Sequence, residues 1–166
     1  GGSLVCFIAK SNSTFKVDKS VSRILKQEKK DGFLNPKKIK KYIKKLEILK
    51  KNLDKKIDKI FLKKEKKIFA FGSSVSSTSF FTYFNLTKKV DFIIDDNPLK
   101  QGKYHACGGI PIYPSSYLDK VKNYYGIIFA WEHNNKIIKN FSKFISKNNG
   151  FIELFPKIKI IDKNIN

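Results

Sequence analysis

The chain has 166 residues, a formal net charge of +21 and a hydrophobic fraction of 41%. This length and apolar content predict one globular domain with an appendage at most, and they exclude a wholly disordered chain. No apolar run approaches the roughly 18 residues of a transmembrane helix, and the start of the chain has no signal-peptide pattern. Two widely separated cysteines, Cys6 and Cys107, make neither a disulfide framework nor a zinc site. We therefore expect a reduced, cytoplasmic protein with no membrane partner.

The positive charge comes almost entirely from lysine, because Arg23 is the only arginine. Arginine supplies the bidentate hydrogen bonds that read phosphates and guanine edges in specific nucleic-acid complexes. A lysine-rich surface of this kind is more typical of a solvated face. The charge therefore argues against a nucleic-acid partner, while attraction of smaller anions such as nucleotide phosphates stays open as an alternative.

Residues 1–66 are predicted to contain one strand and two lysine-rich helices. The apolar run at 4–9 has strand character, although no partner hairpin lies nearby. Residues 20–30 predict a short helix with Ser20 as its N-cap, and Asp31 and Gly32 predict its end.

A longer helix is predicted to begin at Asn35 and Pro36, with asparagine as the N-cap and proline as the first helical residue. Its apolar residues recur every three or four positions and form one stripe over about six turns. Packing of this stripe on the following domain is favoured over pairing in a coiled coil. The stripe consists of Ile39, Ile43, Leu46, Leu49, Leu53, Ile57 and Ile60.

From residue 67 the sequence predicts strands that alternate with helices. The strands are expected at 68–71, 90–94, 110–113, 127–130 and 151–155, with helices at 75–84, after Pro114 and at 134–146. Such alternation implies a parallel sheet covered on both faces. The predicted fold class is therefore α/β, a Rossmann-like parallel sheet with helices on both faces, preceded by an N-terminal strand and a long helical segment. The predicted domains are residues 1–66 and 67–166.

Ligands of such a sheet bind at the carboxyl ends of its strands, so the residues after each strand are candidates. The first loop opens a helix, whose free N–H groups attract anions, and its five serines and one threonine add hydroxyl donors. A phosphate site is predicted here, although one glycine does not make a dinucleotide-binding motif. The alternative is a serine-rich helix start that caps itself. The candidate residues are Gly72, Ser73, Ser74, Ser76, Ser77 and Thr78.

Two later loops supply further candidates. An acid at the position of Asp95 can accept hydrogen bonds from a ribose, but Asp95 and Asp96 before Asn97 also predict a turn. After the fourth strand, Trp131 offers a stacking surface next to Glu132 and His133, and the alternative is a helix cap with an edge-packed indole. No catalytic group and no metal site can be argued from the spacing.

Four stretches, 67–72, 95–104, 110–112 and 130–131, resemble the C-terminal, Rossmann-like domain of sugar-nucleotide C-methyltransferases that use S-adenosylmethionine. The segment N-P-L-K-Q-G-K-Y, beginning at Asn97, is the most specific element, and the resemblance covers essentially the whole chain. The opening residues 1–4 resemble the junction with the methyl-donor domain of that family.

The resemblance implies that this chain is a fragment that binds and positions a nucleotide-linked keto-deoxysugar. S-adenosylmethionine and zinc are then expected in missing N-terminal domains, with no cofactor in this fragment, and the missing methyl-donor domain is an expected partner. The fragment alone is expected to be inactive. The loop at 72–79 matches the phosphate-facing helix start of the family, and further matches are Asp95, Asn97, Lys100, Gln101 and Trp131.

The sequence also departs from the family pattern in three places. Ser76 and Ser77 replace an expected basic residue and glycine, and Ala106 and Cys107 replace an expected Pro-Gly. Glu132, where asparagine is expected, would repel a neighbouring phosphate. Two other functions stay open: a stand-alone nucleotide- or dinucleotide-binding module, and a basic nucleic-acid-binding protein.

Overall fold

A computed structural model describes residues 4–64 and 66–163 of the protein. Two compact units divide the chain, Gly1–Lys45 and Leu46–Asn166. The opening residues 1–3, where a domain junction was expected, lie outside the described residues. The assignment of 1–66 and 67–166 to separate domains stays a prediction.

In the first unit, residues 4–18 form neither helix nor strand, so the strand predicted at 4–9 is wrong. The side chains of Leu4, Val5, Phe7 and Ile8 are exposed, and no strand in the described part of the chain pairs with them. Without a ladder partner, the apolar run has no means of satisfying its backbone groups as a strand.

Helix α1, Lys19–Asp31, begins one residue before the predicted N-cap Ser20. Asp18 is the N-cap instead, because its carboxylate accepts a 2.7 Å hydrogen bond from the backbone N–H of Ser20. The helix ends at Gly32 as predicted, since Gly32 has the left-handed conformation (φ 70°) that a C-terminal cap favours.

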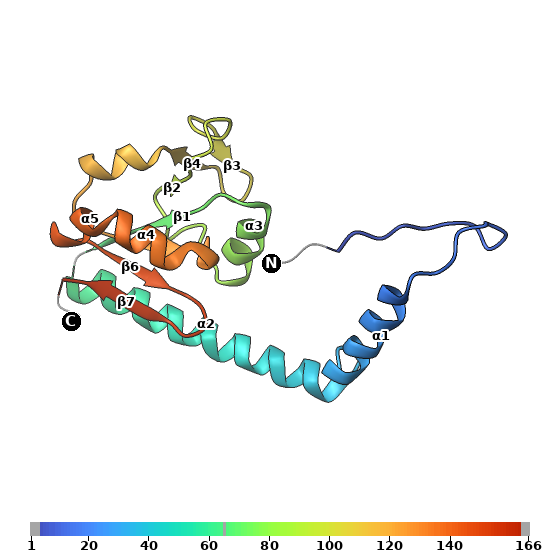
Figure 1. Ribbon diagram of the computed structural model, residues 1–166. Coiled ribbons are helices and arrows are strands. Elements are labelled where there is room, and N and C mark those ends of the chain that lie inside the picture. Colours follow the sequence, from blue (N-terminus) through green and yellow to red (C-terminus); the bar gives the residue numbers. More distant parts are fainter. Residues whose placement is uncertain (1–3, 65, 164–166) are drawn as a thin grey trace. The chain divides into compact units, whose positions relative to one another are not determined.

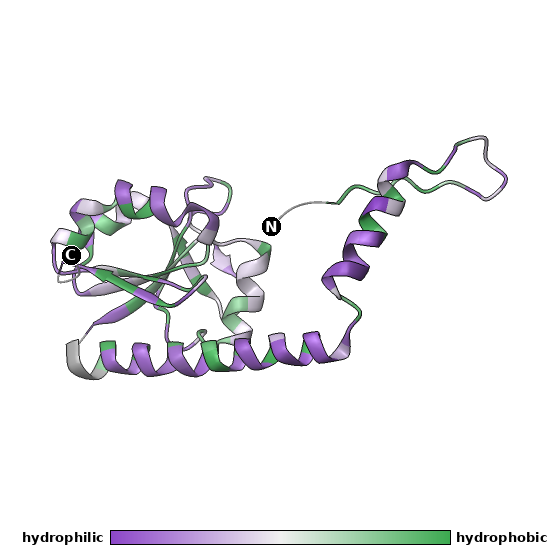
Figure 2. Cartoon of the chain, turned by 60° about the horizontal axis from the view of Figure 1, so that its bottom comes forward, coloured by the Kyte–Doolittle hydropathy of each residue, from purple (hydrophilic) through white to green (hydrophobic). Residues whose placement is uncertain are grey.

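Helix α2, Pro36–Lys64, runs from the first compact unit into the second. Asn35 is its N-cap as predicted, with Oδ1 accepting a 3.0 Å hydrogen bond from the N–H of Lys37. Hydrophobic residues recur along the helix between hydrophilic ones (Figure 2). In the second unit Leu53, Ile57 and Ile60 are buried in the core, which confirms the predicted packing for this half of the stripe.

The second unit contains a seven-stranded sheet in the order β3-β4-β2-β1-β5-β6-β7 (Figure 1). The five inner strands are parallel, whereas β3 and β7 pair antiparallel at the two edges. The strands are β1 Lys67–Phe71, β2 Ile93–Ile94, β3 Tyr104–His105, β4 Ile110–Tyr113, β5 Tyr124–Ile128, β6 Gly150–Glu153 and β7 Lys159–Asp162. This arrangement confirms the predicted Rossmann-like α/β class and adds two edge strands that the sequence did not predict.

Helices cover both faces of this sheet because the side chains of each inner strand alternate between them. In β1, Ile68 and Ala70 pack with α2 and α3, while Phe69 and Phe71 pack with η1, α4 and α5. The helices are α3 Val75–Tyr83, η1 Ser115–Lys120, η2 Trp131–His133, α4 Asn134–Asn140 and α5 Ser142–Ser146. The helix predicted at 134–146 is therefore interrupted at Phe141, and the predicted strand at 90–94 is shorter.

An aromatic core fills the second face. The Phe69 ring stacks on Phe92 at 5.2 Å between centroids and meets Phe144 and Phe151 edge-on. A Cβ at Gly126, opposite Phe69 in β5, would lie 2.3 Å from the ring. The glycine therefore makes room for the aromatic cluster, and this packing fixes the register of β1 and β5 beneath the loops at their carboxyl ends.

Candidate functional site

The side on which the chain adds strands to the sheet reverses between β1, the central strand, and its parallel neighbour β5. From β1 the chain builds β2 and β4 on one side, and it then returns to place β5 on the other. Ligands of open α/β sheets bind in the crevice at such a switch point. The two loops approach closely there, because a Cβ on Gly72 (φ 102°) would lie 3.3 Å from the Cβ of Ala130. The carboxyl ends of β1 and β5 therefore form the candidate site.

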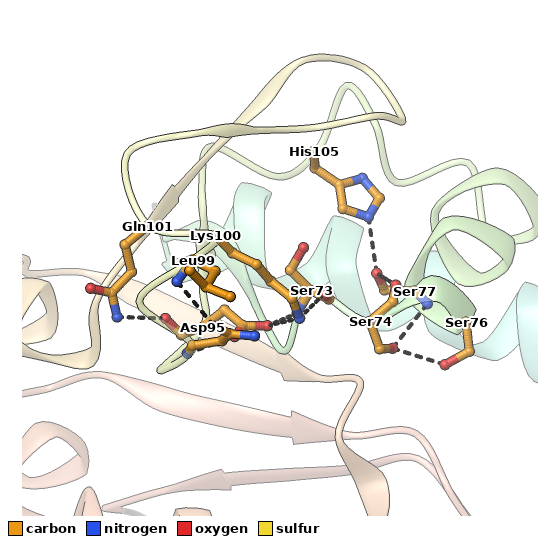
Figure 3. Close-up of polar contacts among 10 residues, drawn as sticks. Ser73, Ser74, Ser76, Ser77, Asp95, Leu99, Lys100, Gln101 and His105 are labelled. Atoms are coloured by element: carbon orange, nitrogen blue, oxygen red, sulfur yellow. Dashed lines mark hydrogen bonds and ion pairs between the residues drawn. The ribbon is translucent and has the colours of Figure 1, made fainter.

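The loop after β1 leads directly into helix α3. Ser74 is the N-cap, and its Oγ accepts a 3.3 Å hydrogen bond from the N–H of Ser77 and shares one of 2.8 Å with the hydroxyl of Ser76 (Figure 3). The N–H groups of Val75 and Ser76 precede the first intrahelical hydrogen bonds. No side chain in the described part of the chain caps these two groups, so they can meet an anion together with the positive end of the helix dipole.

Asp95, which follows β2, joins the serine loop after β1 to the loop after β2. Its Oδ2 accepts a 2.7 Å hydrogen bond from the N–H of Ser73 and lies 3.0 Å from Nζ of Lys100, while Oδ1 accepts from the N–H of Asn97 at 2.9 Å. The Asp95 side chain is only 12% exposed, against 35% for Lys100. The carboxylate therefore links the two loops by hydrogen bonds, and the N–H of Ser73 already has an acceptor within the protein.

The rest of the N-P-L-K-Q-G segment folds around the same carboxylate (Figure 3). Lys100 Nζ donates to the carbonyl oxygen of Ser73 at 2.5 Å, and Gln101 Nε2 donates to the carbonyl oxygen of Asp95 at 3.1 Å. Asn97 Oδ1 accepts from the N–H of Leu99 at 3.0 Å, which makes the expected turn. The segment is therefore held by its own side chains and carries the ammonium group of Lys100 next to the serine loop.

A buried contact that the sequence did not predict joins helix α3 to strand β3. Ser77 is fully buried and His105 is 6% exposed, and Ser77 Oγ lies 3.0 Å from His105 Nε2. The imidazole also packs against the ring of Phe81, with 5.0 Å between centroids. In the sequence His105 stands between Gly102 and Gly108, and no spacing rule links it to Ser77.

The remaining predicted site residues lie apart from this network. Trp131 is 44% exposed and meets the ring of Phe155 at an interplanar angle of 63°, so its outer surface is open at the carboxyl end of β5. His133 is exposed, and its backbone N–H donates to the carbonyl oxygen of Ala130 at 2.8 Å. The carbonyl oxygen of Thr78 accepts from the hydroxyl of Thr82 within α3. The structure thus gathers the serine loop with Asp95–Gln101 and leaves Trp131 and His133 on the other side of the switch point.

Across 4–64 and 66–163, no group of three or more histidine, cysteine, aspartate or glutamate side chains could hold a metal ion. Within the same ranges, no helix combines the length and apolar character that crossing a membrane requires. The network at the edge of the sheet contains backbone amides, hydroxyls and an ion pair, which are groups that bind and orient a ligand.

Comparison with known proteins gives the family. The family described as "C-methyltransferase C-terminal domain" matches residues 1–156. C-methyltransferase NovU of Streptomyces niveus is 24% identical over 163 residues, which are 97% of this chain and 38% of the relative. The chain thus spans well under half the length of this curated relative. Because the family match covers most of the chain, including the serine loop and the Asp95 segment, the protein belongs to the C-methyltransferase C-terminal domain family.

Proposed function

We propose that this chain binds and positions a nucleotide-linked keto sugar for C-methylation by a longer protein. The observation that carries the proposal is the match of the C-methyltransferase C-terminal domain family over residues 1–156, a range that includes the loops at the switch point described above. Transfer of a methyl group between two substrates gains much of its rate from correct placement of the acceptor. Binding and orientation are what backbone amides and hydroxyls at the edge of a sheet can supply.

The start of helix α3 is the proposed site for the diphosphate. The N–H groups of Val75 and Ser76 and the hydroxyl of Ser76 would donate to phosphate oxygens, and the helix dipole favours the negative charge. Lys100 adds positive charge nearby, although its ammonium group is shared with Asp95 and Ser73. Selectivity for the anion then comes from the geometry of the loop rather than from the excess of lysine over the whole chain.

The exposed face of Trp131 is the proposed platform for the base of the nucleotide. Aromatic side chains stack on any nucleobase because each base has a π-face. The indole lies at the carboxyl end of β5, across the switch point from the serine loop. A nucleotide that spans the crevice would thus place its phosphates on α3 and its base on Trp131. Glu132, next to the indole, would repel a phosphate in the opposite orientation.

The methyl donor is proposed to be S-adenosylmethionine bound by another part of the longer protein. When bound, this group supplies an electrophilic methyl carbon on sulfur. The residues of this chain do not fit it, because the loop after β1 has the single Gly72 and is filled by hydrogen-bonded serines. Zinc is likewise not assigned to this chain. We therefore place no catalytic residue here, and the role of the chain is to hold the sugar nucleotide.

Titration of the chain with thymidine diphosphate and a thymidine-diphosphate sugar, followed by NMR, tests this function. We expect amide shifts confined to residues 72–79, 95–101 and the segment around Trp131. Inorganic phosphate serves as the control for non-specific attraction to lysine. Shifts confined to lysines outside these loops would count against the proposal, and a rise in melting temperature with NAD would favour a dinucleotide-binding module instead.

A further inference from the structure

His105 and Ser77 form a hydrogen-bond chain whose direction can be read from its two ends. At one end, His105 Nδ1 lies 3.2 Å from the backbone nitrogen of Cys107, which can only donate. Nδ1 must therefore carry a lone pair and no proton. In a neutral imidazole the proton is then on Nε2, which faces the hydroxyl oxygen of Ser77 at 3.0 Å.

The hydrogen bond at the Ser77 end of the series independently places a proton on Nε2 of His105. The hydroxyl of Ser77 donates its single proton to the carbonyl oxygen of Ser74 at 2.5 Å, and a carbonyl oxygen can only accept. Ser77 Oγ therefore has only lone pairs left for His105, so Nε2 must be the donor. The Ser77 end requires a proton on Nε2 and the Cys107 end requires a bare Nδ1, so the two ends together specify the neutral, Nε2-protonated form of His105. The residue is 6% exposed and its ring packs against Phe81, while the Cys107 thiol of the same loop lies 3.6 Å from the hydroxyl of Thr82.

We propose that His105 is a positioning residue for the nucleotide-sugar site, acting through Ser77 on the first turn of helix α3. The inference rests on the proposed function. The carbonyl oxygen of Ser74 receives two hydrogen bonds from Ser77, one from its N–H at 3.0 Å and one from its hydroxyl. Ser74 is the N-cap, so its backbone sets the direction in which the uncapped N–H groups of Val75 and Ser76 point.

The same contact fixes the loop between β3 and β4 against α3. His105 belongs to β3, and a Cβ on Gly108 would lie 3.1 Å from Thr87, so this loop also lies against the segment that follows α3. Loss of the Ser77 contact would leave a buried imidazole N–H without an acceptor, which is costly. The loop and the helix start are therefore expected to move together when His105 is altered.

The tautomer can be measured directly from the imidazole nitrogen shifts of the ¹⁵N-labelled chain at neutral pH. We expect His105 to show a protonated Nε2 and a bare Nδ1. A protonated Nδ1, or averaged shifts at His105, would overturn the assignment. This measurement needs no ligand, so its result is independent of whether the chain binds a nucleotide.

The positioning role is tested by two substitutions with thymidine diphosphate as the probe. In His105→Gln, the amide nitrogen can take the place of Nε2 and donate to Ser77, so we expect an affinity within about twofold of the native chain. In His105→Asn, the shorter amide reaches only the Nδ1 position, and we expect binding about tenfold weaker, the loss that one buried hydrogen bond causes. Thr82→Val is the matched control, because it removes another contact to the same loop outside this chain of hydrogen bonds.

The possible failures are distinguishable. Equal affinity in His105→Asn and the native chain, or equal weakening in both His105 variants, would overturn the role of His105 alone. Absence of binding by the native chain to thymidine diphosphate and to its sugar conjugate would overturn the proposed function, and the positioning role would fall with it. Melting temperatures of the three variants show whether each is folded under the conditions of the titration.

Discussion

The carboxylate of Asp95 accepts a 2.7 Å hydrogen bond from the backbone N–H of Ser73, which joins the loops that follow two neighbouring parallel strands. An acid at this position was expected to meet a ribose, and that role stays a prediction. The hydrogen bonds of Asp95 show a second role, which is structural. Because Oδ2 also meets Lys100 and Oδ1 meets Asn97, the acid organises the loop from within the protein.

Asp95→Asn should destabilise the protein and weaken nucleotide binding. The amide removes the negative charge opposite Lys100 and weakens the charge-assisted bond from Ser73, so we expect a loss of about 1–2 kcal/mol in the free energy of unfolding. Urea denaturation followed by circular dichroism measures it. Asp96→Asn is the control, because Asp96 is exposed and accepts a long hydrogen bond of 3.3 Å from the N–H of Ser115. Equal stability of the two variants would contradict the conclusion that the Asp95 carboxylate holds these loops together.

Nucleotide binding should change the fluorescence of the chain. Trp131 is the only tryptophan, and its exposed face lies at the carboxyl end of β5. A base stacked on the indole replaces water and quenches its emission. We expect saturable quenching by thymidine diphosphate and none by inorganic phosphate, which has no base. A saturable NMR response at the serine loop with unchanged emission would remove Trp131 from the site while leaving the phosphate assignment intact.

Shortening an apolar side chain of the α2 stripe should reduce folding stability strongly in one half of the helix and hardly at all in the other. Leu53 is fully buried in the sheet-containing unit, so Leu53→Ala should cost about 2–5 kcal/mol of folding free energy. Ile43 is 47% exposed, and Ile43→Ala should change stability by no more than about 0.5 kcal/mol. Thermal unfolding of both variants under the same conditions gives the comparison. A large effect at Ile43 would show that this part of the stripe is covered in solution.

Stability should fall at alkaline pH partly through Tyr124. Its hydroxyl donates to Asp91 Oδ2 at 2.8 Å, and burial, followed by this hydrogen bond and the negative charge of Asp91, raises the pKa of the phenol above its ordinary value. A raised pKa means that the folded state favours the protonated phenol. The stabilisation is therefore complete below about pH 10 and is lost as the pH rises further.

Tyr124→Phe should remove this component of the alkaline loss, so the variant should lose less stability than the native chain above about pH 10. Tyr42→Phe, at a side chain that is 61% exposed, is the control. Denaturation at a series of pH values, together with the ultraviolet absorbance of tyrosinate, measures both effects. If the free energy of unfolding of the Tyr124 variant fell with pH as steeply as that of the native chain, the hydrogen bond to Asp91 would not contribute to the alkaline loss of stability.

The inner sheet could be predicted because its strands are short apolar runs between turn signals, as in Ile68–Phe71. The edge strands could not. β3 has only two residues, Tyr104 and His105, and its existence depends on pairing with β4 rather than on a local pattern. The reverse error occurred at residues 4–9, where a local apolar pattern has no pairing partner among the described strands. Ladder formation is a property of two segments, and one segment shows only half of it.

The position of the site could be predicted from the sequence, whereas its internal contacts could not. Parallel strands end at one edge, so the residues after each strand were candidates for one site, and the bond from Ser73 to Asp95 shows that the loops at 72–79 and 95–101 lie together. Pattern alone did not reveal that Asp95 would be occupied by protein donors, nor that His105 would reach Ser77. Both contacts depend on the path of the chain between β2 and β4, which is set by turns at Asn97 and Gly108.

The Ser77–His105 contact also determines which chemistry this edge of the sheet excludes. A serine beside a histidine is the arrangement by which many hydrolases make a nucleophile, and it requires the imidazole to accept the hydroxyl proton. Here every hydrogen bond points the other way, from the amide of Cys107 through the ring to the carbonyl of Ser74. No proton can leave Ser77 toward the ring, so the hydroxyl remains a poor nucleophile. A hydroxyl in this arrangement would leave a bound sugar nucleotide intact, which agrees with the proposal that this chain holds its substrate for a reaction elsewhere in a longer protein.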